Sequence, residues 1–131
     1  MNMVGIEPTS AVEAAALIAT ARREPAPVDL VHLARQTFGS ADLEREVLRL
    51  FVQQGAGLVR VIATAGDATA RAEYAHRLKG SARAVGATKV GRLAEALETA
   101  SEREAAGLAA DLARAVEDVE RFVAELLAPA A

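Results

Sequence analysis

The chain has 131 residues, 52% of them apolar, which is enough for one domain with its own hydrophobic core. A net charge of −3, with both signs mixed along the chain, argues against a broad nucleic-acid surface, and the absence of cysteine excludes disulfides and thiol chemistry. Only His32 and His76 could supply nitrogen to a metal, and neither a signal-peptide pattern nor an apolar run of membrane-spanning length is present.

These properties predict a soluble, cytoplasmic protein without a metal or other cofactor of its own. Only 3% of the residues are aromatic, so the core must be built from alanine, leucine and valine. Alanine and leucine are strong helix formers, and the aromatic and β-branched residues that favour strands are sparser. The composition therefore predicts an all-α fold.

The first helix is expected ahead of the main body of the protein. Ser10 and Glu13 have the spacing of a capping box, which predicts a helix over residues 11–22. That helix must end before Pro25, because proline bars the preceding residue from helical geometry. Residues 1–27 are thus predicted to be an accessory helix followed by a proline-containing linker.

Two further helices are predicted before the middle of the chain. A short one covers residues 29–37 and is closed by Gly39. A long amphipathic one runs over 43–65, with apolar residues recurring at threes and fours. Gly55 and Gly57 lie inside it at a cost of about 1 kcal/mol each relative to alanine, so we expect a bend or close helix packing there. The apolar positions of the long helix are Val47, Leu50, Phe51, Leu58, Val61, Ile62 and Ala65.

Three more helices complete the chain. Asp67 can cap the first, which Gly86 is placed to terminate. Thr88 begins the next, and a capping box at 101–104 starts the last, which Pro129 stops.

Four substantial amphipathic helices joined by short turns predict an antiparallel up-down four-helix bundle, with the short N-terminal helices against or across one end. We expect residues 28–131 to form this bundle domain and residues 1–27 to remain outside it.

The stretch from Ala75 to Ala87 separates into two faces on a helix of 3.6 residues per turn. Around one row, within about 60° of His76, lie small and cationic residues, and the opposite row is apolar. The first row consists of Ala72, His76, Lys79, Gly80, Arg83 and Ala87. An imidazole, two cations and several small residues on one exposed row indicate more than packing.

The sequence Ala75-His76-x-Leu78-Lys79-Gly80-Ser81, followed by Gly86-Ala87 and Leu97-Glu98, resembles the histidine phosphotransfer (HPt) domain of multistep phosphorelays. The similarity extends from Val28 to Leu127. It implies a phosphocarrier that takes a phosphoryl group on His76 from the aspartate of one receiver domain and passes it to another. It also implies that response-regulator receiver domains, and a hybrid histidine kinase, are the partners and that the receiver supplies Mg²⁺.

The residue types fit that chemistry. A neutral, exposed imidazole is a nucleophile near neutral pH, and Lys79 on the same row can meet the new negative charge of the phosphoryl group as a mobile, exposed cation. Arg83, two turns from His76, adds a cation at longer range and can set partner preference. Gly80, Ala72 and Ala87 keep the surface low for an incoming domain.

The resemblance also assigns a role to Glu98, 22 residues after His76. In HPt domains, a Glu or Gln on the following helix commonly accepts a hydrogen bond from the second ring nitrogen. Such a partner fixes the tautomer and the orientation of the ring. The small residues Gly91 and Ala94 on the same edge would let this helix come near the histidine helix.

Plainer interpretations stay open for single residues. Lys79 and Arg83 could be a solvated basic face, and Glu98 an ordinary surface charge. His32 lies beside an apolar stripe without a companion cluster, which favours a structural or exposed role. Ser81 is expected to pack at the helix edge. Gln53, Gln54 and Phe51 are expected to be solvated or packing residues.

Two alternatives to the phosphocarrier remain at the level of the whole chain. One is a scaffold module that docks a receiver domain without carrying phosphate, and the other is a structural bundle in which the motif is coincidental. No phosphate-cradling glycine-rich loop for ATP is present, so we do not expect an autokinase or other enzyme. We expect a monomer that binds neither nucleic acid nor a membrane.

Overall fold

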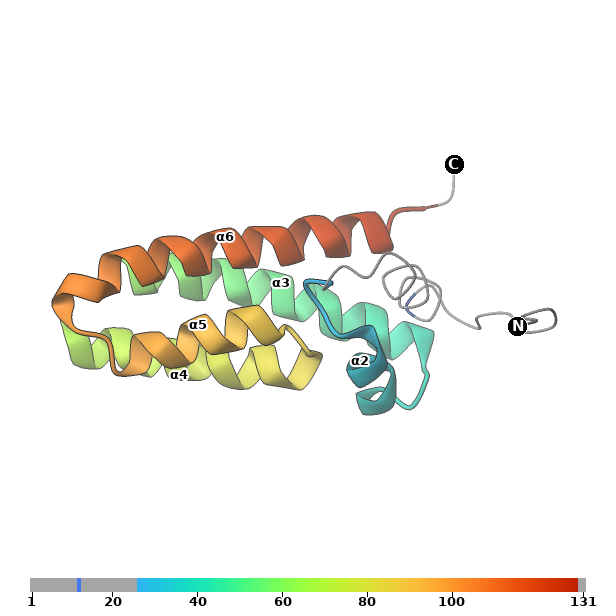
Figure 1. The fold of residues 1–131 in the computed structure, drawn as a ribbon. Helices are drawn as coiled ribbons and strands as arrows, with labels where there is room; N and C mark the ends of the chain where they lie inside the picture. The colour runs from blue at the N-terminus through green and yellow to red at the C-terminus, as the bar shows by residue number, and fades with distance from the viewer. Residues whose placement is uncertain (1–11, 13–25, 130–131) are drawn as a thin grey trace, which may run out of the picture.

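The computed structural model describes Val12 and residues 26–129 of the chain. These residues form an all-helical structure, and no strand occurs among them. In chain order the helices are α2 (Leu30–Gln36), α3 (Ala41–Thr64), α4 (Ala68–Val85), α5 (Thr88–Glu98) and α6 (Glu102–Leu126) (Figure 1). The helix predicted over residues 11–22 lies outside the described residues, apart from Val12, which is helical and buried.

The helix starts follow the sequence signals closely. Ser40 and Asp67 cap α3 and α4, each accepting a hydrogen bond from the backbone N–H three residues on. Ser101 and Glu104 form the predicted capping box at the start of α6. These side chains satisfy N–H groups that a helix cannot pair internally, which fixes where each helix begins.

Helices α3 to α6 form a four-helix bundle with α2 packed against one end. The connections 65–67, 86–87 and 99–101 are short, and successive helices reverse direction in Figure 1. Helix α3 lies beside α4 and α6, and α5 also contacts both α4 and α6. Each helix contributes one fully buried leucine to the core; these are Leu33, Leu48, Leu78, Leu97 and Leu112.

Two glycines let neighbouring helices approach closely. Helix α3 runs unbroken through Gly55, where an added Cβ would lie 3.6 Å from Val116 of α6, so close packing rather than a bend explains this residue. Gly91 of α5 would place a Cβ 3.7 Å from both Ala82 and Arg83 of α4. This approach of α5 to α4 brings the end of α5 beside the histidine helix.

Gly86 terminates α4 in the left-handed conformation, with φ +85°. Its carbonyl accepts a hydrogen bond of 2.7 Å from the N–H of Asp29, the residue that caps α2. A Cβ at Gly86 would come within 2.8 Å of the Asp29 carbonyl oxygen. The α4–α5 turn and the start of α2 are therefore locked together at one end of the bundle.

Helix α3 is the one helix among the described residues that could cross a membrane by length and composition alone, because an 18-residue window within it has a mean hydropathy of 1.2. The sequence contains no uninterrupted apolar run of that length, because Glu44, Arg45, Glu46 and Arg49 fall within α3. Part of its apolar character is accounted for by the face that packs into the core. The rest lies on its outer edge, where Leu50 and Val61 are exposed.

Candidate functional site

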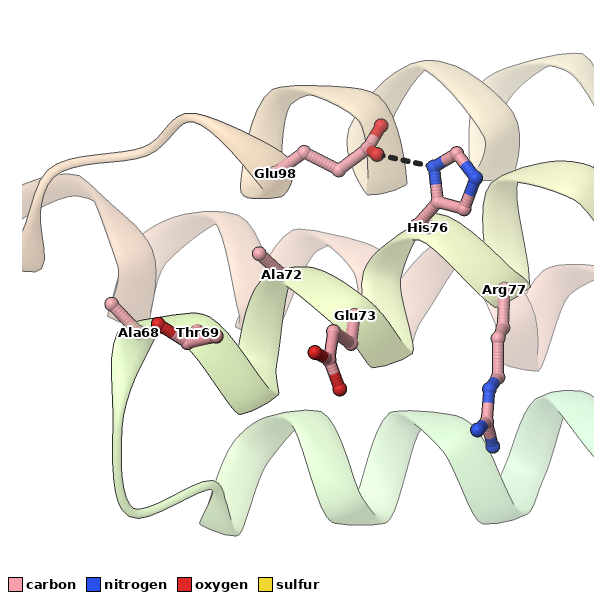
Figure 2. Close-up of a pocket in the computed structure, with 7 residues that line it drawn as sticks. All are labelled: Ala68, Thr69, Ala72, Glu73, His76, Arg77 and Glu98. Atoms are coloured by element: carbon pink, nitrogen blue, oxygen red, sulfur yellow. Dashed lines mark hydrogen bonds and ion pairs between the residues drawn. The ribbon is translucent and has the colours of Figure 1, made fainter.

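The centre of the site is His76, which projects from the middle of α4 with 68% of its side chain exposed. Its Nδ1 lies 2.6 Å from Oε1 of Glu98, the last residue of α5 (Figure 2). An ionised carboxylate can only accept a hydrogen bond, so Nδ1 carries the proton and donates it. The other ring nitrogen, Nε2, then holds a free lone pair on the side of the ring that points away from Glu98.

Lys79 is bound to the same carboxylate. Its Nζ lies 2.6 Å from Oε2 of Glu98, and only 16% of its side chain is exposed. The expectation of an exposed, mobile cation was therefore wrong. The helical row was placed correctly, but the sequence did not show that the aliphatic stem of Lys79 lies against the bundle and that its ammonium reaches across to α5.

Glu98 thus joins two partners, and its ionisation responds to both. The hydrogen bond from the Lys79 ammonium lowers the pKa of Glu98 most; partial burial opposes this, and the hydrogen bond with His76 lowers it further. The carboxylate consequently stays ionised at neutral pH and acts as the acceptor for both groups.

Arg83 has a partner of its own. Its guanidinium donates to the Glu95 carboxylate at 2.8 Å, and both side chains are more than half exposed. The expectation of a cation available to the phosphoryl group at longer range must therefore take account of Glu95, which balances this charge within the chain. Exposed ion pairs of this kind are weak.

The small residues of the predicted row divide into two groups. Gly80 is exposed, and a Cβ added there would meet nothing within 4 Å; Ala72 is partly exposed beside His76. Ala87, in contrast, is fully buried, so the expectation that it borders the docking surface was wrong. Helix α4 ends at Val85, and the left-handed turn at Gly86 directs the chain inward, so the helical row does not extend to Ala87.

A depression of about 690 Å³ lies beside the imidazole, on the side toward the N-terminus of α4 (Figure 2). It is lined by Ala68, Thr69, Ala72, Glu73, His76, Arg77 and Glu98. The sequence reasoning missed Thr69 and Glu73, although their positions seven and three residues before His76 place them near its row on a helix.

On the other side of α4, Ser81 ties the histidine helix to α3. Its Oγ donates a hydrogen bond of 2.8 Å to Oε1 of Gln54. Gln54 shares one row of α3 with Leu50, Gly57 and Val61, which we call the α3 edge row. Leu50 and Val61 are 55% and 36% exposed, so these two members of the predicted apolar stripe are not core residues.

His32 has a structural position, as the sequence suggested. It is partly buried at the α2 end of the bundle, on the wall of a small cavity that also touches Arg83 and Gly86. Among the described residues, no group of three or more His, Cys, Asp or Glu side chains could hold a metal ion.

Comparison with known proteins agrees with this geometry. A family model described as the Hpt domain matches residues 46–128, which is well over half of the 131-residue chain. No curated protein and no solved structure gives a significant match. The matched range contains His76, Lys79 and Glu98. The chain belongs to the family of histidine phosphotransfer domains, the phosphocarriers of phosphorelays.

Proposed function

We propose that this protein carries a phosphoryl group on Nε2 of His76 between the aspartates of two receiver domains. The observation that supports this most is the ring itself: it is exposed, its Nδ1 proton is held by Glu98, and its Nε2 lone pair is free. This is the state of a positioned nucleophile. Residues 28–131 would act as the transfer domain, as a monomer in the cytoplasm.

The proposed step needs no group from this chain beyond the imidazole and its supports. The Nε2 lone pair attacks the phosphorus of an aspartyl phosphate, an Nε2–P bond forms, and the O–P bond breaks with its electron pair left on the aspartate. The Nδ1–H remains bound to Glu98, so the ring carries a positive charge next to the phosphoryl group. The receiver domain would supply Mg²⁺ and position the phosphoryl group.

The neighbouring residues have supporting roles in this proposal. Glu98 orients the imidazole, and Lys79 stabilises the phosphoryl group once it is attached. Gly80 and Ala72 leave room for the partner, and Arg83 contributes to the choice of partner through its charge.

The receiver domain would dock against the α3 edge row as well as α4. Helices α3 and α4 run in opposite directions (Figure 1). Because Gln54 bonds to Ser81, the helical rise then puts Gly57 and Val61 at about the level of His76. By the same register, exposed Val61 lies near the level of His76, and exposed Leu50 lies at about the level of Val85, near the C-terminal end of α4. Apolar side chains of this kind commonly anchor a partner.

The test is transfer of labelled phosphate from phosphorylated receiver domains of the same organism. The protein should acquire an acid-labile, base-stable label, and His76→Gln should abolish it. A His76→Gln variant that still acquires the label would contradict the proposal. Binding of a receiver domain without transfer would instead support the second candidate, a docking scaffold, which the exposed α3 edge row also fits.

A further inference from the structure

One carboxylate, that of Glu98, accepts hydrogen bonds from two groups that have different roles in the proposed function, the imidazole of His76 and the ammonium of Lys79. Glu98 Oε1 accepts from His76 Nδ1 and Glu98 Oε2 accepts from Lys79 Nζ, each at 2.6 Å. With a neutral imidazole, the ammonium and the carboxylate cancel in charge. Lys79 is thus held at the Nδ1 side of the site, by Glu98, and not at Nε2, where the phosphoryl group would form.

We propose that Glu98 competes with the phosphoryl group for the ammonium of Lys79, and that this competition weakens the retention of phosphate on His76 and favours its onward transfer. The inference rests on the proposed phosphocarrier function. It makes Glu98 a positioning residue for Lys79 as well as for the imidazole.

The charges of the site support the competition. A phosphoryl group brings about two negative charges, and together with the carboxylate of Glu98 these outnumber the two positive charges of the site, which are the phosphorylated ring and the Lys79 ammonium. Lys79 is only 16% exposed, so its bond to Glu98 is less screened by solvent than a surface ion pair. Lys79 must therefore divide its three hydrogens between two anions or leave one of them.

The other nearby arginines are engaged elsewhere in the described structure. Arg83 is paired with Glu95 at 2.8 Å and stands two turns of α4, about 10 Å, from His76, whereas Lys79 stands one turn away. Arg77 lies over the ring of Tyr74, 5.8 Å from its centroid, and points away from Glu98 in Figure 2. Lys79 is therefore the cation placed to reach both anions, and the strength of its bond to Glu98 sets how much of it remains for the phosphoryl group.

The decisive variant is Glu98→Gln, tested with and without the lysine. Glutamine keeps a carbonyl oxygen that can accept from Nδ1–H, but it removes the negative charge that binds Lys79. A second pair of proteins carries Lys79→Met, which keeps the stem and removes the ammonium. Comparison of the four proteins isolates the coupling between residues 79 and 98 from the direct effect of Glu98 on the imidazole.

The measurement uses phosphoramidate, so it does not depend on any receiver domain. The P–N bond of phosphoramidate breaks, the Nε2–P bond forms, and ammonia leaves. At fixed ammonia and phosphoramidate concentrations, ³¹P NMR gives the ratio of phosphorylated to free protein. For each background we divide the ratio of phosphorylated to free protein in the Glu98→Gln variant by the ratio with Glu98 present. We expect this quotient to be at least about five times larger with Lys79 present than in the Lys79→Met background, which corresponds to one charge-assisted hydrogen bond.

An equal effect of Glu98→Gln in both backgrounds, or a less favourable one when Lys79 is present, would overturn the inference. A second readout follows the ¹⁵N signal of the Lys79 ammonium, which a merely structural role would not move. On phosphorylation of His76 this signal should shift in the wild type, and an unchanged signal would also overturn the inference. The four proteins could show the coupling with phosphoramidate while no receiver domain transfers phosphate to the wild type. In that case the proposed function would be wrong and the inference about Glu98 and Lys79 would stand.

Discussion

Ser81 of α4 donates a hydrogen bond to Gln54 of α3 at 2.8 Å, five residues along the helix from His76. This contact joins the helix that carries His76 to the α3 edge row, which includes Leu50 and Val61. Ser81 thus faces α3, whereas the supports of the imidazole come from α5 on the other side of α4. In the proposed function the α3 edge row would serve docking and the α5 contacts would serve the chemistry of the imidazole, and substitutions can test the two groups independently.

Leu50→Asp should weaken receiver binding by about tenfold, because it places a charge in the proposed apolar contact. Leu50 is 55% exposed, so the fold should not change. Isothermal titration against a receiver domain that transfers phosphate checks the affinity. Phe38→Asp is the control, since Phe38 is 93% exposed in the α2–α3 turn, away from the α3 edge row. Equal losses in the two variants would contradict the docking surface.

Gly80→Ala should stabilise the protein by about 1 kcal/mol and yet slow phosphotransfer. A Cβ there meets nothing within the chain, so the glycine is not required by internal packing. Gly107→Ala on α6 is the matched control, because it is also exposed and open. It should give a similar gain by urea denaturation with an unchanged transfer rate. A transfer rate that is unchanged in Gly80→Ala as well would show that the partner does not approach this residue.

Lys79→Ala should slow transfer to His76 or shorten the lifetime of the phosphohistidine, because the phosphoryl group loses its nearest cation. Circular dichroism should show unchanged helical content, since the ammonium bonds only to a side chain at the edge of the bundle. Rapid-quench measurements with a labelled receiver domain give the rate. If the variant had the wild-type transfer rate and phosphohistidine lifetime, Lys79 would have no role in stabilising the phosphoryl group.

The stability of the protein should fall at acid pH partly through Glu98. Its pKa is lowered from the ordinary 4.5, first by the Lys79 hydrogen bond, so the ionised form is favoured in the folded state. Such a group stabilises the fold above its unfolded pKa, and this contribution is lost as pH falls through the folded value. Urea denaturation from about pH 6 to about pH 3 should therefore show a smaller acid loss in Glu98→Gln. An equal loss of unfolding free energy with falling pH in the wild type and in Glu98→Gln would contradict this role of Glu98.

Gly86→Ala should destabilise the protein by at least about 2 kcal/mol, because alanine is strained in the left-handed region and its Cβ meets a backbone oxygen. The affected oxygen belongs to Asp29, 2.8 Å from the position of the added Cβ. Thermal unfolding measures the loss. Gly57→Ala, inside α3 with open space around it, should have the opposite sign.

The local signals in the sequence predicted the helices well, because capping is a short-range property. Asp67, Gly86 and the box from Ser101 to Glu104 lie where the sequence placed them. The bundle followed from amphipathic periodicity. What periodicity could not show is how far each apolar stripe is covered, and so Leu50 and Val61 were assigned to a stripe whose edge is exposed.

The site was predictable in part for a similar reason. The row on α4 placed His76 and Lys79 on one face, and the resemblance to HPt domains pointed to Glu98. In the structure Glu98 bonds to both His76 and Lys79. The state of Lys79 depends on a contact between two helices, which a single helical row does not contain. The prediction for Ala87 was wrong because the left-handed residue Gly86 ends α4 before the helical row reaches it.

The number of residues on each side of the turn at Gly86 and Ala87 determines whether His76 and Glu98 meet. His76 lies ten residues before Gly86, and Glu98 lies eleven residues after Ala87. The segments of α4 and α5 between the turn and the two side chains are therefore nearly equal in length. One residue inserted within α5, between Thr88 and Glu98, would rotate Glu98 by about 100° around the helix axis and move it by about 1.5 Å relative to the start of α5. The carboxylate would then miss the imidazole although both helices survived. The interval between them is thus as much a part of the site as either side chain.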